Sequence, residues 1–119
     1  MPENRKNVFI VEDEIDQQAI LRRFFGALGY AVVGVAGSPG ELQNLFDADP
    51  DLVVDIATID AYVPNDGDGY RAAAIVRNRF PDAFIIAVSG EESDHGDVYL
   101  SKPYTLAELK QVLDSIPKR

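Results

Sequence analysis

The sequence predicts an α/β fold in which helices cover both faces of a parallel sheet of five strands. Short apolar runs of strand length alternate along the 119 residues with stretches whose apolar residues recur at helical spacing. The first run, Val8 to Val11, is uninterrupted, which is typical of a parallel strand buried on both faces. No repeat, low-complexity tract or Ser/Gly-rich linker divides the chain, so we expect one domain over residues 1–119.

Five apolar runs, most of them rich in Val, Ile and Ala, are the expected strands. They are Val8 to Val11, Tyr30 to Ala36, a segment within Leu52 to Asp60, Ala83 to Ser89, and Val98 to Ser101. The third strand ends with Ile56 to Ile59, which lead directly into Asp60.

Helices are expected after the first, second, third and fifth strands. They are Ile15 to Leu28, a helix from Ser38 to about Asp47, Tyr70 to about Arg79, and a last helix from Thr105 onward. Ser38, Pro39 and Glu41 are a typical N-cap, first-turn proline and first-turn acid, and Thr105 with Glu108 is a capping box. The expected inner faces are Ile15, Ala19, Leu21, Phe24, Phe25 and Leu28 in the first helix and Leu106, Leu109, Leu113 and Ile116 in the last.

The connection between the fourth and fifth strands is short. Its residues, Gly90 to Gly96, are polar and carry no apolar face that could pack on a sheet. A helix here is expected to be reduced or replaced by a loop, and this loop is expected to be mobile because few contacts would hold it. His95, the only histidine, lies in this stretch and is expected to be exposed to solvent.

Composition excludes several classes of function. A net charge of −9 repels a phosphate backbone, so direct binding to DNA or RNA is not expected. The chain has no cysteine, which excludes disulfides and thiol nucleophiles and favours a reducing compartment. Residues 1–7 are polar and precede only four apolar residues, which predicts neither a signal peptide nor a membrane span. We expect a cytoplasmic protein.

Polar side chains that could bind a metal ion or take part in a reaction follow four of the strands. They are Glu12, Asp13 and Glu14 after the first, Asp60 after the third, Ser89 at the end of the fourth, and Lys102 after the fifth. Ligand sites of parallel sheets collect at the carboxyl ends of the strands, so we expect these side chains to lie together. Converging carboxylates need a hard cation, and oxygen ligands with room for water suit Mg²⁺. One carboxylate could then act as a nucleophile toward a phosphoryl group.

In this order, these residues resemble the receiver domains of bacterial response regulators, over essentially the whole chain. The resemblance implies a flavodoxin-like, doubly wound sheet with strand order 2-1-3-4-5, here in a stand-alone domain with a shortened or missing fourth helix. It implies that Asp60, four residues before Pro64, is the phosphoacceptor. Asp13 would bind Mg²⁺ directly, Glu12 would act through water, and the backbone carbonyl of Tyr62 would be a further ligand.

The same resemblance implies further roles near the end of the chain. Ser89 would be the switch hydroxyl, and Lys102 would contact the phosphoryl group, with a cis bond to Pro103. Tyr99 stands where the family keeps a rotating aromatic side chain, and it either switches or only packs. Lys102 is also a candidate structural partner of Asp13.

The implied function is a phosphorylation-activated switch of a two-component or phosphorelay system. A histidine kinase or histidine phosphotransfer protein would donate the phosphoryl group, and the output would be contact with a downstream protein target rather than a metabolic reaction. The oligomeric state stays open, with a homodimer among the options. Alternatives are a degenerate receiver that acts as a phosphorylation-independent interaction module, and an aspartyl-phosphate hydrolase. The hydrolase is disfavoured because Tyr62 stands where a haloacid dehalogenase-type phosphatase has a second aspartate.

Two assignments compete with others in the sequence. Residues 51–55 imitate the approach to a phosphoacceptor, so Asp55 rivals Asp60; we prefer Asp60 because only it precedes the proline turn at the right spacing. In that turn, either Asp66-Gly67 or Asp68-Gly69 takes the usual position of the Asp-Gly pair.

Overall fold

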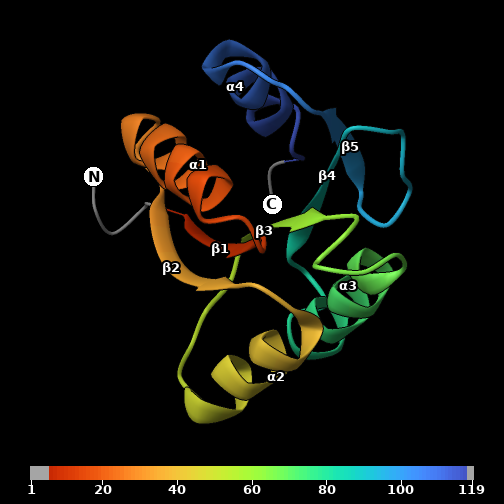
Figure 1. Cartoon of the computed structure of the whole chain (residues 1–119). Helices are drawn as coiled ribbons and strands as arrows, with labels where there is room; N and C mark the ends of the chain where they lie inside the picture. Colours follow the sequence, from red (N-terminus) through yellow and green to blue (C-terminus); the bar gives the residue numbers. More distant parts are fainter. Residues whose placement is uncertain (1–5, 118–119) are drawn as a thin grey trace.

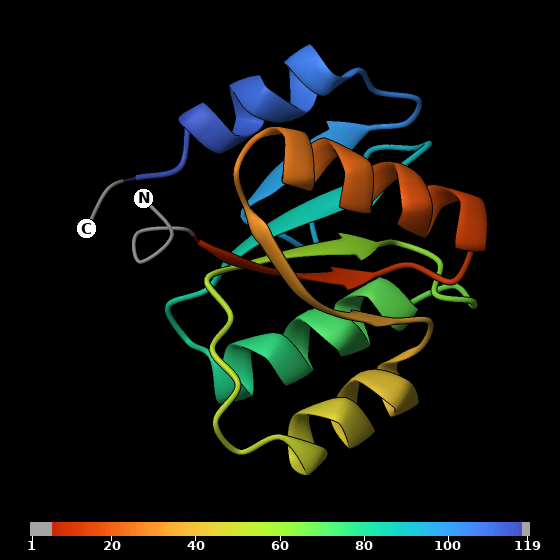
Figure 2. The same ribbon diagram turned by 90° about the vertical axis from the view of Figure 1, so that its left-hand side faces the viewer.

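The computed structural model describes residues 6–117. Five parallel strands form one sheet in the order β2-β1-β3-β4-β5, as the sequence predicts. The strands are β1 (Asn7–Val11), β2 (Ala31–Ala36), β3 (Ile56–Asp60), β4 (Phe84–Ser89) and β5 (Val98–Ser101). The helices are α1 (Ile15–Ala27), α2 (Pro39–Ala48), α3 (Asp68–Arg79) and α4 (Leu106–Asp114). Figures 1 and 2 show α1 and α4 on one face of the sheet and α2 and α3 on the other.

The starts of α2 and α4 form as the sequence predicts. Ser38 Oγ accepts a hydrogen bond from the Glu41 N–H at 3.1 Å, and Pro39 is the first residue of α2. Thr105 and Glu108 form a reciprocal capping box at the start of α4. These caps pair backbone N–H groups that have no partner inside a helix, so the two starts are fixed by local sequence.

Successive side chains of β1 point to opposite faces of the sheet and pack in the core on each side. Phe9 and Val11 pack with α2 and α3, while Val8 and Ile10 pack with α1 and α4, and all four are at most 1% exposed. The Phe9 ring meets Phe46 of α2 edge to face, with 5.2 Å between the ring centroids. Burial on both faces is what an uninterrupted apolar strand requires.

Three residues that the sequence assigns to inner helix faces are exposed instead. Ile15 is 78% exposed and Leu106 is 37% exposed, and Ala19 is also on the surface. Ile15 and Leu106 are the first residues of their helices, where helical spacing alone does not bring a side chain over the sheet. The buried residues of α1 and α4 are Leu21, Phe25, Leu109 and Leu113.

Within the described residues, the β4–β5 loop (residues 90–97) contains no helix, as predicted. The expectation that few contacts hold it is wrong. The Asp97 N–H donates to the Ile85 carbonyl at 2.7 Å, and the Asp97 carboxylate accepts from the Ile85 N–H at 2.8 Å. A Cβ atom at Gly96 would lie 2.7 Å from the Ala87 nitrogen and 2.8 Å from the Ile85 oxygen. The loop therefore packs its own backbone directly on β4.

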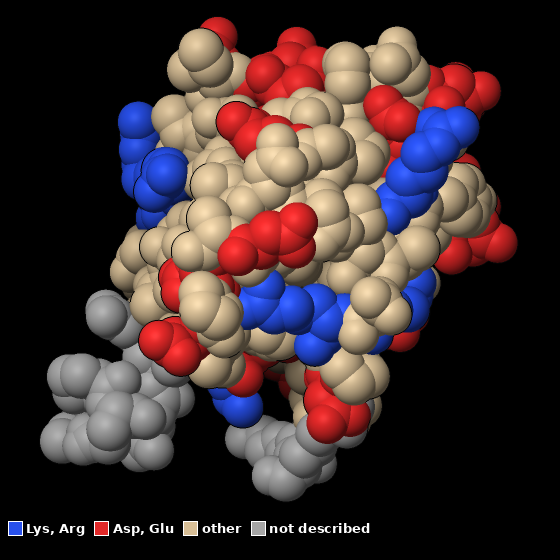
Figure 3. All heavy atoms as spheres, turned by 90° about the horizontal axis from the view of Figure 1, so that it is seen from below, with Lys and Arg blue, Asp and Glu red and all other residues tan. Residues whose placement is uncertain are grey.

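Surface charge is mixed on the face shown in Figure 3. Lys and Arg side chains form a row there that Asp and Glu side chains border. Neighbouring carboxylates weaken the positive potential that such a row presents. Within residues 6–117, none of the helices combines the length and apolar character needed to cross a membrane.

We predict that Gly96→Ala lowers the free energy of unfolding by about 1–3 kcal/mol, because the added methyl group must displace backbone atoms of β4. Gly90→Ala is the matched control in the same loop, since no heavy atom outside its chain neighbours lies within 4 Å of its Cβ position. Urea unfolding of both variants measures the difference. Equal stability of the two variants would contradict close packing of the loop on β4.

Candidate functional site

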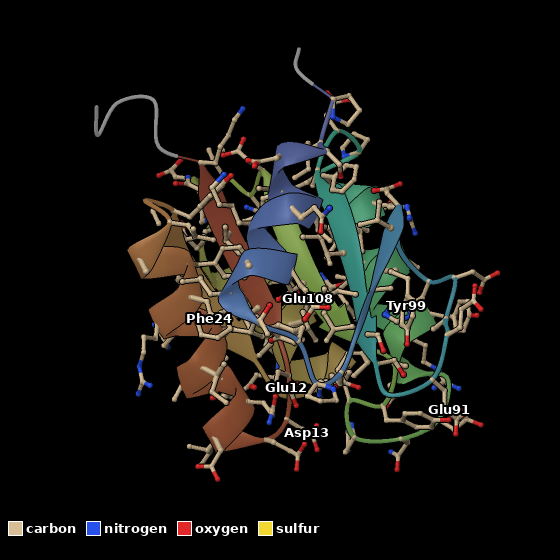
Figure 4. The ribbon with its side chains drawn as sticks, turned by 90° about the horizontal axis from the view of Figure 1, so that it is seen from above. Glu12, Asp13, Phe24, Glu91, Tyr99 and Glu108 are labelled. Atoms are coloured by element: carbon tan, nitrogen blue, oxygen red, sulfur yellow. The ribbon has the colours of Figure 1, made fainter. Side chains whose placement is uncertain are left out.

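The carboxyl ends of the strands border a cleft of about 390 Å³. Its lining consists of Asp13, Glu14, Asp60, Tyr62, Pro64, Ser89, Gly90, Glu91 and Lys102. Most of the site residues that the sequence predicts are in this lining, namely Asp13, Asp60, Tyr62, Ser89 and Lys102. Glu12 is buried at 1% exposure, and Figure 4 shows it beside Asp13 at the end of β1.

Lys102 joins two buried carboxylates. Its Nζ donates to Glu12 Oε1 at 2.9 Å and to Asp60 Oδ2. Glu12 and Asp60 are 1% and 8% exposed, so little water screens the three charges. Burial lowers the pKa of Lys102, but its bonds to the two carboxylates outweigh this effect and the pKa is raised. The structural partner of Lys102 is therefore Glu12 and not the predicted Asp13.

Glu12 is the more deeply buried acid of the site. Burial raises the pKa of Glu12 to about 7, against the lowering effect of hydrogen bonds from Lys102 and the Glu14 N–H. Repulsion from Asp60 adds to the rise. Gln18 of α1 donates to the Glu12 carbonyl at 2.6 Å and helps to fix this strand end. Both protonation states of Glu12 are therefore populated near neutral pH.

Asp60 ends β3, and its carboxylate is held from two sides. Oδ1 accepts from the Tyr62 N–H at 2.9 Å, and Oδ2 accepts from Lys102. A carboxylate fixed in this way is oriented before a reaction begins. The Lys102–Pro103 bond is cis, as the resemblance implied, and Val63–Pro64 is cis as well.

The start of α3 shows which Asp-Gly pair supports Asp60. Asp68 is 7% exposed, and the Gly69 N–H donates to the Ala61 carbonyl at 3.1 Å. A Cβ atom at Gly69 would lie 2.9 Å from both the Ala61 Cα and the Asp60 oxygen, so a glycine lets α3 begin this close to the site. The pair Asp66-Gly67 lies further out in the turn, with Asp66 exposed. Asp68-Gly69 therefore takes the supporting position.

Ser89 and Tyr99 are connected through one hydrogen bond. Ser89 ends β4 at 3% exposure, and its Oγ accepts from the Glu91 N–H at 3.2 Å. Tyr99 of β5, labelled in Figure 4, donates its hydroxyl to the Ser89 carbonyl at 3.0 Å. A change in the position of Ser89 would therefore reach Tyr99 directly.

Asp55, the rival of Asp60, stands at the other end of β3. It precedes the strand, and its Oδ2 accepts from the Asn7 N–H at 2.8 Å. Asn7 is the first residue of β1, so Asp55 lies at the amino ends of the strands. The length of β3 separates it from the cleft.

The prediction that His95 is exposed is wrong, because the residue is 2% exposed. Its Nε2 lies 2.6 Å from the Ile59 carbonyl oxygen, and its Nδ1 lies 2.7 Å from Ser93 Oγ. A carbonyl oxygen only accepts, so Nε2 carries a proton and donates it to Ile59, while Nδ1 pairs with the Ser93 hydroxyl. The β4–β5 loop contains no apolar side chain larger than glycine, so the His95 ring was the one candidate in it to fill space against the sheet.

The donor set of the cleft fits Mg²⁺. Asp13 and Asp60 supply carboxylate oxygens, and Mg²⁺ in proteins uses one or two carboxylates and keeps several waters. Among residues 6–117, no three acidic, histidine or cysteine side chains stand close enough to hold a cation by themselves. A backbone oxygen, for which Tyr62 is the predicted donor, and water would complete the coordination. The ammonium group of Lys102 on Asp60 shows that this carboxylate attracts a cation.

A family model described as the response regulator receiver domain matches residues 8–114. The chain is also similar to a probable transcriptional regulator, ycf27, of Cyanophora paradoxa, with 28% identity over 124 residues. That match covers 98% of this chain and 50% of the relative, so the chain spans half the length of this curated relative.

Solved structures confirm the flavodoxin-like fold class. A chain of the CheX–CheY complex with beryllofluoride and Mg²⁺ from Borrelia burgdorferi matches with a TM-score of 0.80 at 21% identity, over 98% of both chains. A response regulator protein from Burkholderia pseudomallei, with a phosphorylated aspartic acid, a calcium ion and citrate, matches with a TM-score of 0.76 at 25% identity. This second match covers 95% of the present chain and 67% of the other.

We predict that Lys102→Met lowers the free energy of unfolding by about 2 kcal/mol well above pH 7 in the absence of divalent cations, because Glu12 and Asp60 lose their shared cation. Urea unfolding over a series of pH values measures the loss.

The pH dependence has a definite sign. Folded Glu12 has a pKa of about 7 against an ordinary 4.5, so stability falls as the pH rises through this window. In Lys102→Met the fall should be larger and extend to higher pH, because the carboxylate has lost its counter-charge. The double variant Glu12→Gln/Lys102→Met should recover part of the loss. A loss that is independent of pH would contradict the role of Glu12.

Proposed function

This chain belongs to the response regulator receiver domain family, whose members are signalling switches, and on that premise we propose that it is switched by phosphorylation of Asp60. The observation that carries the proposal is the cleft that Asp60 shares with Asp13, Ser89 and Lys102. Together they offer a nucleophile, a carboxylate for a metal ion, a hydroxyl and a lysine, which is the set that phosphoryl transfer to an aspartate requires.

In the proposed reaction, an Asp60 carboxylate oxygen forms a bond to phosphorus. The phosphorus–nitrogen bond of the donor phosphohistidine breaks, and its electron pair stays on the donor imidazole. Lys102, already bonded to Asp60 Oδ2, is in position to donate to a phosphoryl oxygen. The Ser89 hydroxyl, whose oxygen accepts from the Glu91 N–H, can turn its own proton toward the phosphoryl group.

The acidic pair after β1 supports this chemistry. Mg²⁺ held by Asp13, Asp60 and the Tyr62 carbonyl would offset the negative charge of the carboxylates and of the phosphoryl oxygens. Glu12 is hydrogen-bonded to Lys102 at 2.9 Å, so the lysine retains one carboxylate partner when the Asp60 carboxylate becomes an acyl phosphate. The phosphorylated aspartic acid of the Burkholderia pseudomallei structure and the beryllofluoride and Mg²⁺ of the Borrelia burgdorferi complex support the assignment by analogy.

The proposed partners follow from the same chemistry. A histidine kinase or histidine phosphotransfer protein is the donor, since phosphohistidine is a phosphoryl donor of sufficient reactivity. The output is a contact with a downstream protein, as the CheX–CheY pairing illustrates for a neighbour of the same fold.

Wild-type protein incubated with Mg²⁺ and phosphoramidate is expected to gain the mass of one phosphoryl group in intact mass spectrometry. Asp60→Asn should abolish the gain, because the amide lacks the nucleophilic carboxylate. Asp55→Asn is the matched control, with the same substitution just before the same strand, and should leave the gain unchanged.

A gain that survives in Asp60→Asn and disappears in Asp55→Asn would move the phosphoacceptor to the other end of β3. If the wild-type protein gains no mass even with Mg²⁺, the chain is instead a degenerate receiver that acts without phosphorylation.

A further inference from the structure

A single buried side chain fastens the β4–β5 loop to the strand that carries Asp60. The His95 Nε2–H donates to the Ile59 carbonyl at 2.6 Å, and Ile59 directly precedes Asp60 in β3. The Ser93 hydroxyl bonds to the other ring nitrogen at 2.7 Å and fixes the orientation of the ring. A loop residue therefore holds the backbone next to the proposed phosphoacceptor.

Helix α3 holds the same loop from the outside. The ring of Tyr70 packs edge to face on His95, with 5.8 Å between centroids, and its hydroxyl donates to the Asp94 carboxylate. Arg77 donates to the His95 carbonyl at 3.4 Å and pairs with Asp97 at 3.6 Å. The His95 ring is thus enclosed by β3, α3 and its own loop. Figure 1 shows the backbone of this loop close to α3.

The first residues of this loop are part of the cleft. Gly90 and Glu91 line it, and the Glu91 N–H donates to Ser89 Oγ at 3.2 Å. His95 lies four positions after Glu91, so the wall of the cleft is tied to β3 by one short segment. The same ring thus connects the strand of Asp60 with the loop that follows Ser89.

We propose that His95 is a positioning residue for the phosphorylation of Asp60. It fastens the β4–β5 loop to β3 and so holds Ser89 and Glu91 where the phosphoryl group enters. This inference rests on the proposed function and adds to it a residue that acts through the loop, since His95 is absent from the lining of the cleft.

A role in filling space alone would not explain the contacts of His95. Both ring nitrogens are paired inside the protein, although an apolar ring could fill the same volume without any hydrogen bond. The pairing is also directional, because only a protonated Nε2 can donate to the Ile59 carbonyl, while Nδ1 is the nitrogen that faces the Ser93 hydroxyl. The ring therefore fixes the orientation of the loop relative to β3 as well as the distance between the loop and that strand.

The two hydrogen bonds of His95 can be tested one at a time with substitutions that each replace a single ring nitrogen. In His95→Gln the side-chain amide nitrogen reaches the position of Nε2 and can still donate to Ile59. In His95→Asn the amide group reaches only the position of Nδ1, next to Ser93. His95→Phe keeps the ring and loses both bonds. The full chain of each variant is incubated with Mg²⁺ and a range of phosphoramidate concentrations, and intact mass spectrometry gives the initial rates.

We expect His95→Gln to retain a maximal rate near that of the wild type, and His95→Asn and His95→Phe to lower it roughly fivefold. The dependence on phosphoramidate concentration and the Mg²⁺ affinity from NMR titration should stay unchanged, because the proposed metal ligands are other residues. Equal rates in all four proteins, or a Gln variant as slow as the Asn variant, would overturn the proposal.

A spectroscopic readout tests the contact without any phosphorylation. Long-range ¹H–¹⁵N correlations of the wild-type protein should show the Nε2–H tautomer of His95, and a proton on Nδ1 alone would overturn the bond to Ile59. The two proposals also fail differently. A wild-type protein that accepts no phosphoryl group removes the proposed function together with this role, whereas an active wild type with unaffected Asn and Phe variants removes only the role of His95.

Discussion

Two buried carboxylates, Glu12 and Asp60, share the ammonium group of Lys102, and this arrangement constrains most of the fold. The three residues come from the carboxyl ends of β1, β3 and β5, and Lys102 bonds to partners 90 and 42 positions earlier in the chain. A buried carboxylate without a counter-charge is costly, and one lysine offsets two of them only while the three strand ends stay in register. The apolar layers on both faces of the sheet keep that register and exclude water, which is also why burial raises the pKa of Glu12 to about 7.

The β4–β5 loop covers its part of the sheet without a helix. A helix would need an apolar face, and residues 90–97 have none. The loop instead places the backbone of Gly96 against β4, and Asp97 pairs with both backbone groups of Ile85 by donating its N–H and accepting with its carboxylate. His95 supplies the one ring. This covering depends on directional hydrogen bonds to particular partners, whereas a docked helix depends on buried area, so a single substitution can affect the whole loop.

The features that could be predicted from the sequence are those that depend on local patterns or on the general geometry of parallel sheets. The strand Val8 to Val11 and the helix start at Ser38 are local, and Asp60 and Lys102 were predicted to meet because parallel strand ends share one edge. The surroundings of His95 could not be predicted, since its partner Ile59 lies 36 positions earlier and polar neighbours indicated solvent. The spacing of apolar residues likewise predicts which side of a helix faces the sheet, but not how far the sheet extends beneath the helix. For this reason the exposure of Ile15, at the first position of α1, was not predicted.

The carboxylate cluster and the helix-free loop meet at Ser89. Lys102 is restrained by Glu12, so the lysine would already be in place for a phosphoryl group on Asp60. Such a group would act mainly on Ser89, because within residues 6–117 the only bond of the Ser89 Oγ is the one it accepts from the Glu91 N–H at 3.2 Å. Two paths leave Ser89. One is its carbonyl, to which Tyr99 donates, and the other is the loop as far as His95, where the bond to Ile59 anchors the chain. A phosphoryl group on Asp60 would therefore change the conformation mainly between Gly90 and Glu92 and at Tyr99. Residues 93–97 would stay in place, because they are bonded to β3, β4, α3 and one another.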